Sequence, residues 1–239
     1  MKYTLIATIA AIGLIVGCWF IGQGLGKIKT GDNTISVTGS TQKTITSDVA
    51  KWTSTVSRSI AVDALKTGSD ELAQDVSTLS KYLHQNGVSD GDIIVQPLTI
   101  SPTYSSDYSK GPNISGYTLS QLVIVEGKDV HKITQLAGGA GNLVSSGIQL
   151  SSQPLEYYFS GLADVKRDML AEATTDAKAR AEKIATSSGS KLGTLKSASM
   201  GVFQITPVNS ASLSDEGYYD TSSIEKRVTA VVRTQFAIR

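Results

Sequence analysis

The stretch from Tyr3 to Leu25 constrains this 239-residue chain more than any other feature. It contains no charged residue, and its length matches the roughly 20 residues that a helix needs to cross the hydrocarbon core of a bilayer. The rest of the chain is polar and rich in serine and threonine. We therefore predict an N-terminal membrane anchor over residues 1–28 and a water-facing body over residues 29–239.

A cleaved secretory signal is one alternative for this stretch. Such signals have a shorter apolar region, about 7–15 residues, followed by a small-x-small cleavage site. Here the apolar run continues through Gly17 and Cys18 into Trp19 and Phe20, and no Ala-x-Ala site follows. We therefore expect an uncleaved, single-pass transmembrane helix that acts as a signal anchor.

Cys18 keeps a second alternative open. Ile15-Val16-Gly17-Cys18 resembles a bacterial lipobox, in which the cysteine is lipidated and becomes the first residue of the mature protein. Bacterial lipoproteins leave the apolar region directly after that cysteine, whereas this chain does not. Both interpretations make the lipid bilayer a partner of the chain.

Gly13 and Gly17 form a G-x-x-x-G pair within the stretch, a spacing that lets two membrane helices approach closely. The pair is a candidate helix–helix contact, although glycines are common in membrane helices and tolerated there. Charge does not decide the orientation, because Lys2 precedes the stretch while Lys27 and Lys29 follow it.

Composition limits the function of the body. The net charge of +1 carries no electrostatic signature of nucleic-acid binding, so we expect no nucleic-acid partner. Cys18 is the only cysteine, which excludes an intramolecular disulfide and any cysteine-based metal site in the body.

Hydrophobic periodicity predicts the elements of the body. The pattern predicts strands over residues 34–39, 48–60, 93–103, 114–125, 148–159, 192–206 and 228–238. It predicts one long helix from Leu65 to a C-terminal cap at Gly87, and another over residues 162–188 that ends at Gly189. Asp129 caps a shorter helix, which we expect to end in a flexible turn at residues 138–141.

The predicted elements repeat. Each half of the body has a strand, a long helix that ends in glycine, a strand, a tyrosine-containing polar loop and another strand. We interpret this order as a duplicated β-α-β-β unit, with halves at about 33–126 and 127–239. Long helices packed on a mostly antiparallel sheet make the fold class α+β.

Several segments resemble the membrane-anchored bacterial members of the SIMPL-domain family, formerly domain of unknown function 541. The resemblance extends from about residue 33 to the end. The segments that carry it are Ile21–Leu25, Ile35–Gly39, Asp48–Trp52, Leu150–Phe159, Ala177–Ala181 and Gly189–Gly193.

This resemblance implies a body in the periplasm or on the exterior of the cytoplasmic membrane. It also implies oligomeric assembly and, in one branch of the family, defence against oxidative stress. A eukaryotic branch is tied to immune-kinase signalling. The family has no established catalytic residues, so the resemblance assigns none here.

The residues themselves also reveal no catalytic, cofactor or metal site. His84 and His131 have no partner at metal-ligand spacing, and no nucleophile-elbow, H-E-x-x-H or P-loop motif occurs. Carboxylates gather in Ser214-Asp215-Glu216 and at Asp220. We favour a solvated loop there over a weak calcium site.

Tyrosines accompany serine, aspartate and glycine in the two equivalent polar loops, a composition typical of adaptable contact surfaces. The candidate contact residues are Tyr104, Tyr108, Tyr218 and Tyr219. We expect a non-enzymatic envelope protein that acts through homo-oligomerisation or contact with a protein partner, in envelope or oxidative stress defence. The alternative is a ligand-binding or enzymatic envelope protein whose site combines residues distant in sequence.

Overall fold

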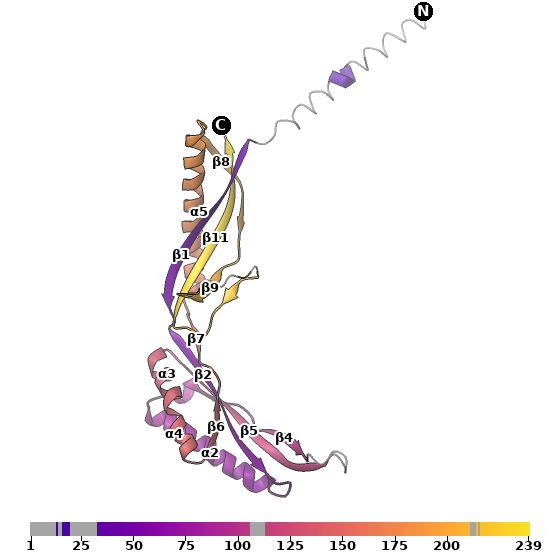
Figure 1. The fold of residues 1–239 in the computed structure, drawn as a ribbon, viewed down its shortest axis with the longest axis vertical. Helices are drawn as coiled ribbons and strands as arrows, with labels where there is room; N and C mark the ends of the chain where they lie inside the picture. The colour runs from indigo at the N-terminus through magenta and orange to yellow at the C-terminus, as the bar shows by residue number, and fades with distance from the viewer. Residues whose placement is uncertain (1–12, 14–15, 20–32, 106–112, 211–213, 215) are drawn as a thin grey trace, which may run out of the picture. The chain divides into compact units, whose positions relative to one another are not determined.

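The computed structural model describes residues 13, 16–19, 33–105, 113–210, 214 and 216–239. Within them the fold is α+β, with helices packed on sheets whose strand pairs are mostly antiparallel (Figure 1). The chain divides into two compact units. Unit 1 comprises Met1–Thr41, Leu170–Gly201 and Val231–Arg239, and unit 2 comprises Gln42–Met169 and Val202–Ala230.

Most of the predicted anchor lies outside the described residues. Of its candidate residues, Cys18 is an exposed free thiol, and a Cβ atom added to Gly13 or Gly17 would meet nothing within 4 Å. Among the described residues, no helix has both the length and the hydropathy of a membrane span.

A sheet with the strand order β3-β5-β2-β6 forms the framework of unit 2, with β4 also paired to β5 and β7 to β2. Two predicted strands are each divided near a proline, Pro97 and Pro154, because proline cannot donate a ladder hydrogen bond. The bounds are β2 (Val49–Ile60), β3 (Ile93–Val95), β4 (Thr99–Tyr104), β5 (Ile114–Gly127), β6 (Gln149–Ser152) and β7 (Glu156–Tyr158).

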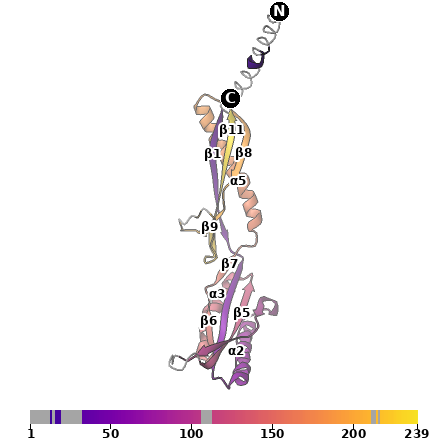
Figure 2. The same ribbon diagram turned by 90° about the vertical axis from the view of Figure 1, so that its right-hand side faces the viewer.

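Helices α2 (Leu65–Gln85), α3 (Val130–Gly139) and α4 (Gly141–Ser145) accompany this sheet, and α2 and α3 pack directly on β2 and β5 (Figures 1 and 2). The alternation predicted for β2 is confirmed by its buried residues. The core on this face includes Ala50, Trp52, Val56, Leu72, Leu79, Leu83, Leu119 and Val123, all at most 1% exposed.

Local signals account for the helix ends. Gly87 has a φ of +75°, the left-handed conformation that follows many helices. The Asp129 carboxylate accepts a hydrogen bond of 3.0 Å from the Lys132 amide, which caps α3. The predicted flexible turn at residues 138–141 is wrong, because α3 continues through Gly139 and α4 begins at Gly141. Leu136 and Leu143 are buried there, so packing compensates for the low helix propensity of glycine.

The second sheet has the strand order β1-β11-β9-β10, with β8 also paired to β11. The C-terminal part of β11 belongs to unit 1, where β1 and β8 are its neighbours. The N-terminal part pairs with β9 in unit 2. The bounds are β1 (Thr34–Thr46), β8 (Leu192–Met200), β9 (Gln204–Pro207), β10 (Tyr218–Tyr219) and β11 (Glu225–Ile238).

Helix α5 (Leu162–Ser187) packs on the sheet of unit 1 through small residues. The spacing of apolar residues predicts a buried stripe along this helix that ends at Ile184. Its alanines in unit 1 are buried as predicted, but Ile184 is 52% exposed and the neighbouring Ala185 is buried in its place. A Cβ atom on Gly39 of β1 would lie 2.2 Å from the Ala173 carbonyl oxygen and 2.4 Å from the Ala177 amide nitrogen. Small residues on both elements therefore allow close contact. The buried alanines are Ala173, Ala177, Ala181 and Ala185.

Candidate functional site

A buried ion pair is the main polar feature of the described residues. Lys226 lies near the start of β11, and Asp220 directly follows β10. The Lys226 Nζ atom lies 3.3 Å from Asp220 Oδ2, and the two side chains are only 1% and 2% exposed. Both ionisable groups are thus almost completely removed from water.

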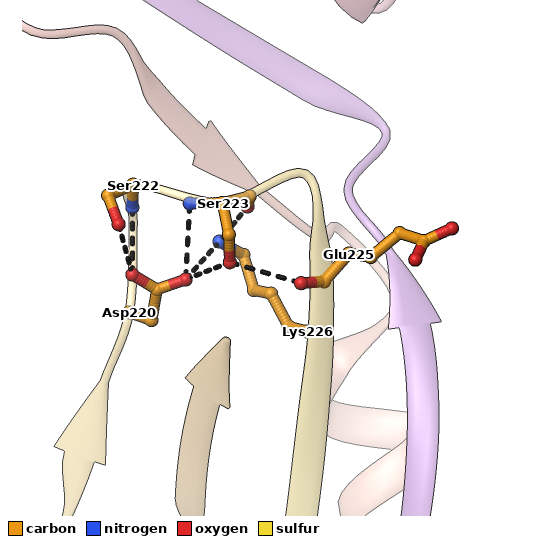
Figure 3. Close-up of polar contacts among 5 residues, drawn as sticks. All are labelled: Asp220, Ser222, Ser223, Glu225 and Lys226. Carbon is orange, nitrogen blue, oxygen red and sulfur yellow. Dashed lines mark hydrogen bonds and ion pairs between the residues drawn. The ribbon is translucent and has the colours of Figure 1, made fainter. Parts of the chain in front are cut away.

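Two serines complete the coordination of the Asp220 carboxylate (Figure 3). The Ser222 amide and hydroxyl donate to Oδ1 at 3.0 and 2.7 Å. The Ser223 amide donates to Oδ2 at 3.2 Å, and the Ser223 hydroxyl donates to the same oxygen. Lys226 Nζ also donates to the Ser223 carbonyl oxygen. Each charge therefore has several partners, as a buried charge requires.

Burial and pairing have opposite effects on the pKa of each group, and a different effect dominates in Asp220 and in Lys226. Burial alone would raise the pKa of Asp220, but the hydrogen bonds from Ser223 and Ser222 and the Lys226 charge hold it far below its ordinary value. Burial lowers the pKa of Lys226, and Asp220 offsets only part of that effect. The geometry favours an ionised carboxylate at neutral pH.

This cluster holds a segment in place, and its two charged side chains are buried. The Asp220 amide donates to the Ile205 carbonyl oxygen at 2.9 Å, and the Tyr157 amide donates to the Thr221 carbonyl oxygen at 2.7 Å. Residues 220 and 221 therefore join β9 to β7 within unit 2. The predicted solvated loop is wrong at Asp220, because the ion pair buries this carboxylate.

Other carboxylates and His84 make ion-pair contacts, and Arg58 joins Glu71 and Asp75 at 2.7 and 2.6 Å. His84 Nε2 lies 2.8 Å from Asp90 Oδ1, a carboxylate whose side chain is 95% exposed. Within the described part of the chain, no group of three or more histidine, cysteine, aspartate or glutamate residues could hold a metal ion.

The predicted contact tyrosines belong to two sheets. Tyr104 ends β4, at the edge of the sheet built on β2 and β5, while Tyr218 and Tyr219 form β10. All three are exposed, and the ring of Tyr219 stacks on Tyr158 with 6.4 Å between centroids. Tyr108 lies outside the described residues.

Unit 1 exposes an apolar strip that sequence reasoning missed. Leu195 and Met200 of β8 pair with Phe236 and Val232 of β11, whose side chains are buried. Cross-strand partners share a face of the sheet. Leu195 and Met200 therefore lie on the same face as these buried residues, yet they are 48% and 57% exposed.

A groove follows the opposite edge of the same unit, between β1 and α5. Its volume is about 510 Å³, and Ile184 on its rim is 52% exposed. Two cationic side chains, Arg180 and Lys183, also reach it. The full lining is Val37, Thr38, Ala179, Arg180, Lys183 and Ile184.

Residues 35–236 match the model of a protein family described as SIMPL, Protein of unknown function (DUF541). The chain belongs to the SIMPL family. The match includes residues of both units and confirms the resemblance to the SIMPL family. No curated protein matches it significantly.

The solved structures that are similar to the SIMPL chain have low sequence identity to it and low TM-scores. An aminohydrolase from methicillin-resistant Staphylococcus aureus is 13% identical with a TM-score of 0.25, over 51% of this chain and 30% of that one. A hydantoinase/carbamoylase family amidase from Burkholderia ambifaria is 14% identical with a TM-score of 0.27, over 56% and 35%. The chain thus spans about a third of the length of these two proteins.

The ligand-free regulatory subunit of aspartate kinase from Thermus thermophilus is also similar. It is 11% identical with a TM-score of 0.20, over 82% of this chain and 88% of that one.

Proposed function

We propose that this SIMPL chain is a non-enzymatic envelope protein that acts by self-assembly through unit 1. One observation carries the proposal: the apolar strip on β8 and the groove beside β1 lie at opposite edges of the same sheet. If the strip of one copy binds the groove of the next, the contact between copies is head-to-tail.

The strip is uncovered because α5 is displaced toward β1. The close approach at Gly39 puts the helix over β1, whereas Leu195 and Met200 of β8 remain exposed on the helix-facing side of the sheet. Within the described residues β8 has no strand on its other side, so its backbone groups are also available for pairing.

A second copy would cover this face if its β1 extended the sheet from β8. In that copy, Ile184 of α5 lines the groove beside β1, next to the place where β8 of the first copy would lie. Leu195 and Met200 of the first copy would then enter the groove of the second. Strand addition supplies backbone hydrogen bonds, and the apolar side chains supply specificity.

We expect substitutions on the strip to dissociate the assembly. Lysine at Leu195 or Met200 places a charge in an interface that needs apolar contact, while both positions are exposed in the single chain and tolerate it. The measurement is the mass of the full-length protein in detergent by light scattering. The wild type should form an oligomer and Leu195→Lys a monomer.

Val144→Lys is the matched control. Val144 is 51% exposed, like the residues of the strip, but it lies on α4 in unit 2. A monomeric wild type contradicts the proposal, as does equal loss of assembly in the control variant.

We further propose that the body is attached to the cytoplasmic membrane, facing the exterior or periplasm, and serves in envelope or oxidative stress defence. The apolar stretch Tyr3–Leu25 and membership of the SIMPL family support this placement. The intact mass of the mature protein separates the two forms of attachment. The complete chain mass supports an uncleaved anchor, whereas cleavage before Cys18 with added acyl mass supports a lipoprotein.

The non-enzymatic part of the proposal draws support from the buried ion pair. Lys226 and Asp220 are the described residues with the most specialised electrostatics, and their side chains are inaccessible. The ligand-binding or enzymatic alternative predicts a monomer with a deep polar pocket, which the same light-scattering measurement tests in part.

We also propose that the two halves derive from duplication. In the first half α2 is followed by β3, β4 and β5, and β4 pairs antiparallel with β5. In the second half α5 is followed by β8, β9, β10 and β11, and β8 pairs antiparallel with β11. Superposing these two sets in an experimental structure tests the idea, and unrelated paths of the two helices would contradict it.

A further inference from the structure

Unit 2 leaves the second face of its main sheet uncovered by α2 and α3, and a cleft opens there. Ser54 and Val56 of β2 are buried on the helix-covered face, so the residue between them, Thr55, points to the other side. The cleft has a volume of about 550 Å³, and its lining residues are Thr55, Gln96, Pro97, Thr99, Ser120 and Leu122.

The interruption between β3 and β4 shapes this cleft. Ladder pairing with β5 stops after Val95 and resumes at Thr99, and the intervening Gln96 and Pro97 form one wall. The Gln96 carbonyl oxygen accepts a hydrogen bond of 2.9 Å from Gln121 Nε2, which holds this wall in position. The cleft is therefore built into the strand edge.

The lining of the cleft includes three residues with hydroxyl groups. Within the described residues, no hydrogen bond engages the hydroxyl of Thr55, Thr99 or Ser120. By contrast, Thr103 and Thr118 of the same hairpin pair with each other at 3.4 Å. Thr99 lies opposite Ser120 in the ladder, so two of the three hydroxyls are cross-strand neighbours. Each can donate and accept a hydrogen bond.

The chemistry of the lining selects an uncharged, polyhydroxylated ligand. None of the six residues is ionisable, so neither an anion nor a cation gains an ion pair there. Leu122 and Pro97 offer apolar surface beside the hydroxyls and the Gln96 amide. A sugar ring has matching parts, with hydroxyls at its rim and C–H groups on its faces. We propose that this cleft binds a neutral saccharide unit of a glycan.

A peptide is the other polymer with uncharged polar groups. It would pair through its backbone with the edge of β4, which has no strand partner among the described residues on that side, and would depend little on side-chain hydroxyls. Loss of the hydroxyls therefore distinguishes the two ligands, because only the saccharide exchanges hydrogen bonds with them.

Saturation-transfer NMR on the full-length protein tests the proposal with cellotriose, a neutral β-1,4-linked glucose trimer, as the probe. We expect transfer to the sugar at millimolar concentration, and weaker binding by about fivefold for each hydroxyl removed in Thr55→Val and Thr99→Val. Valine keeps the shape and strand propensity of threonine, so the fold should persist. A galacturonic acid trimer, which is anionic, should bind more weakly than cellotriose.

Thr103→Val is the matched control, because Thr103 lies on the same strand as Thr99 outside the cleft. Its affinity for cellotriose should equal that of the wild type. The proposal is overturned if cellotriose receives no transfer, if the Thr55 and Thr99 variants bind it as well as the control, or if the anionic trimer binds more tightly.

Discussion

At the scale of single residues, the ion pair between Lys226 and Asp220 fixes the segment that connects β9 to β11 in unit 2. In sequence, β9 ends at Pro207 and β11 begins at Glu225, and the ion pair holds Asp220 in the connection between them. A buried pair adds little net stability compared with apolar residues, but a lone buried charge is costly. Removing either partner should therefore lower the free energy of unfolding by more than the pair itself contributes, because the other charge stays buried and unpaired.

Asp220→Asn tests this cost. Asparagine keeps one accepting oxygen, which serves the donors of Ser222 or those of Ser223 but not both, and it leaves the Lys226 ammonium buried without a counter-charge. We expect the free energy of unfolding to fall by about 3–5 kcal/mol in a denaturant titration. Lys66→Met provides the control, because Lys66 and Asp70 are paired on the surface and such pairs contribute about 0–1 kcal/mol. Equal effects in both variants would contradict the interpretation.

The same carboxylate predicts a dependence on pH. The pKa of Asp220 is depressed in the folded state, so its stabilisation is fully present above its ordinary value of 3.8 and is lost as the pH falls toward the folded value. Unfolding of the wild type and of Asp220→Asn should be compared from neutral pH down to about pH 2. The difference in the free energy of unfolding between the two proteins should become smaller as the pH falls below 3.8. A difference that stays constant there would contradict the assignment.

At the scale of elements, contact between α5 and β1 depends on the absence of side chains. Gly39 faces backbone atoms of α5, which cannot move away by changing rotamer as a side chain can. The alanine stripe and this glycine thus specify how closely helix and strand approach.

Gly39→Ala should therefore separate α5 from β1. The added methyl group overpacks the contact, and we expect a loss of about 1–3 kcal/mol in the free energy of unfolding. Gly91→Ala is the control, because a Cβ atom there meets nothing within 4 Å. Denaturant titration of the two variants gives the comparison, and an unchanged Gly39→Ala protein would show that the helix is free to shift.

At the scale of the whole molecule, neither unit is one continuous stretch of sequence. Unit 1 combines three stretches and unit 2 combines two. The predicted division between residues 126 and 127 falls inside unit 2, where β2 of the first half pairs with β6 and β7 of the second.

A fragment of residues 127–239 should consequently fail to fold alone. It lacks β2, the partner of β6 and β7, and β1, the neighbour of β11. We expect no cooperative thermal transition when its circular dichroism is followed. A cooperative transition would instead make the second half an independent domain.

Sequence periodicity alone determined much of this protein. Alternation identified β2 and most of β11, and the spacing of apolar residues identified α2 and α5, because side-chain direction repeats every 2 or 3.6 residues. Lys226 could have been found in the same way. It is in phase with Val228 and Ala230, which places it on the buried face of β11.

Only the tertiary structure decided the sites. The partners Asp220 and Lys226, the strip on β8 with its groove beside β1, and the cleft beside Gln96 each depend on which segments are neighbours in space. Local pattern states whether a residue lies on an inward or outward face, but not which strand or helix covers that face. Leu195 has the same apolar character as a core residue, and it is exposed because α5 packs over β1 instead of β8.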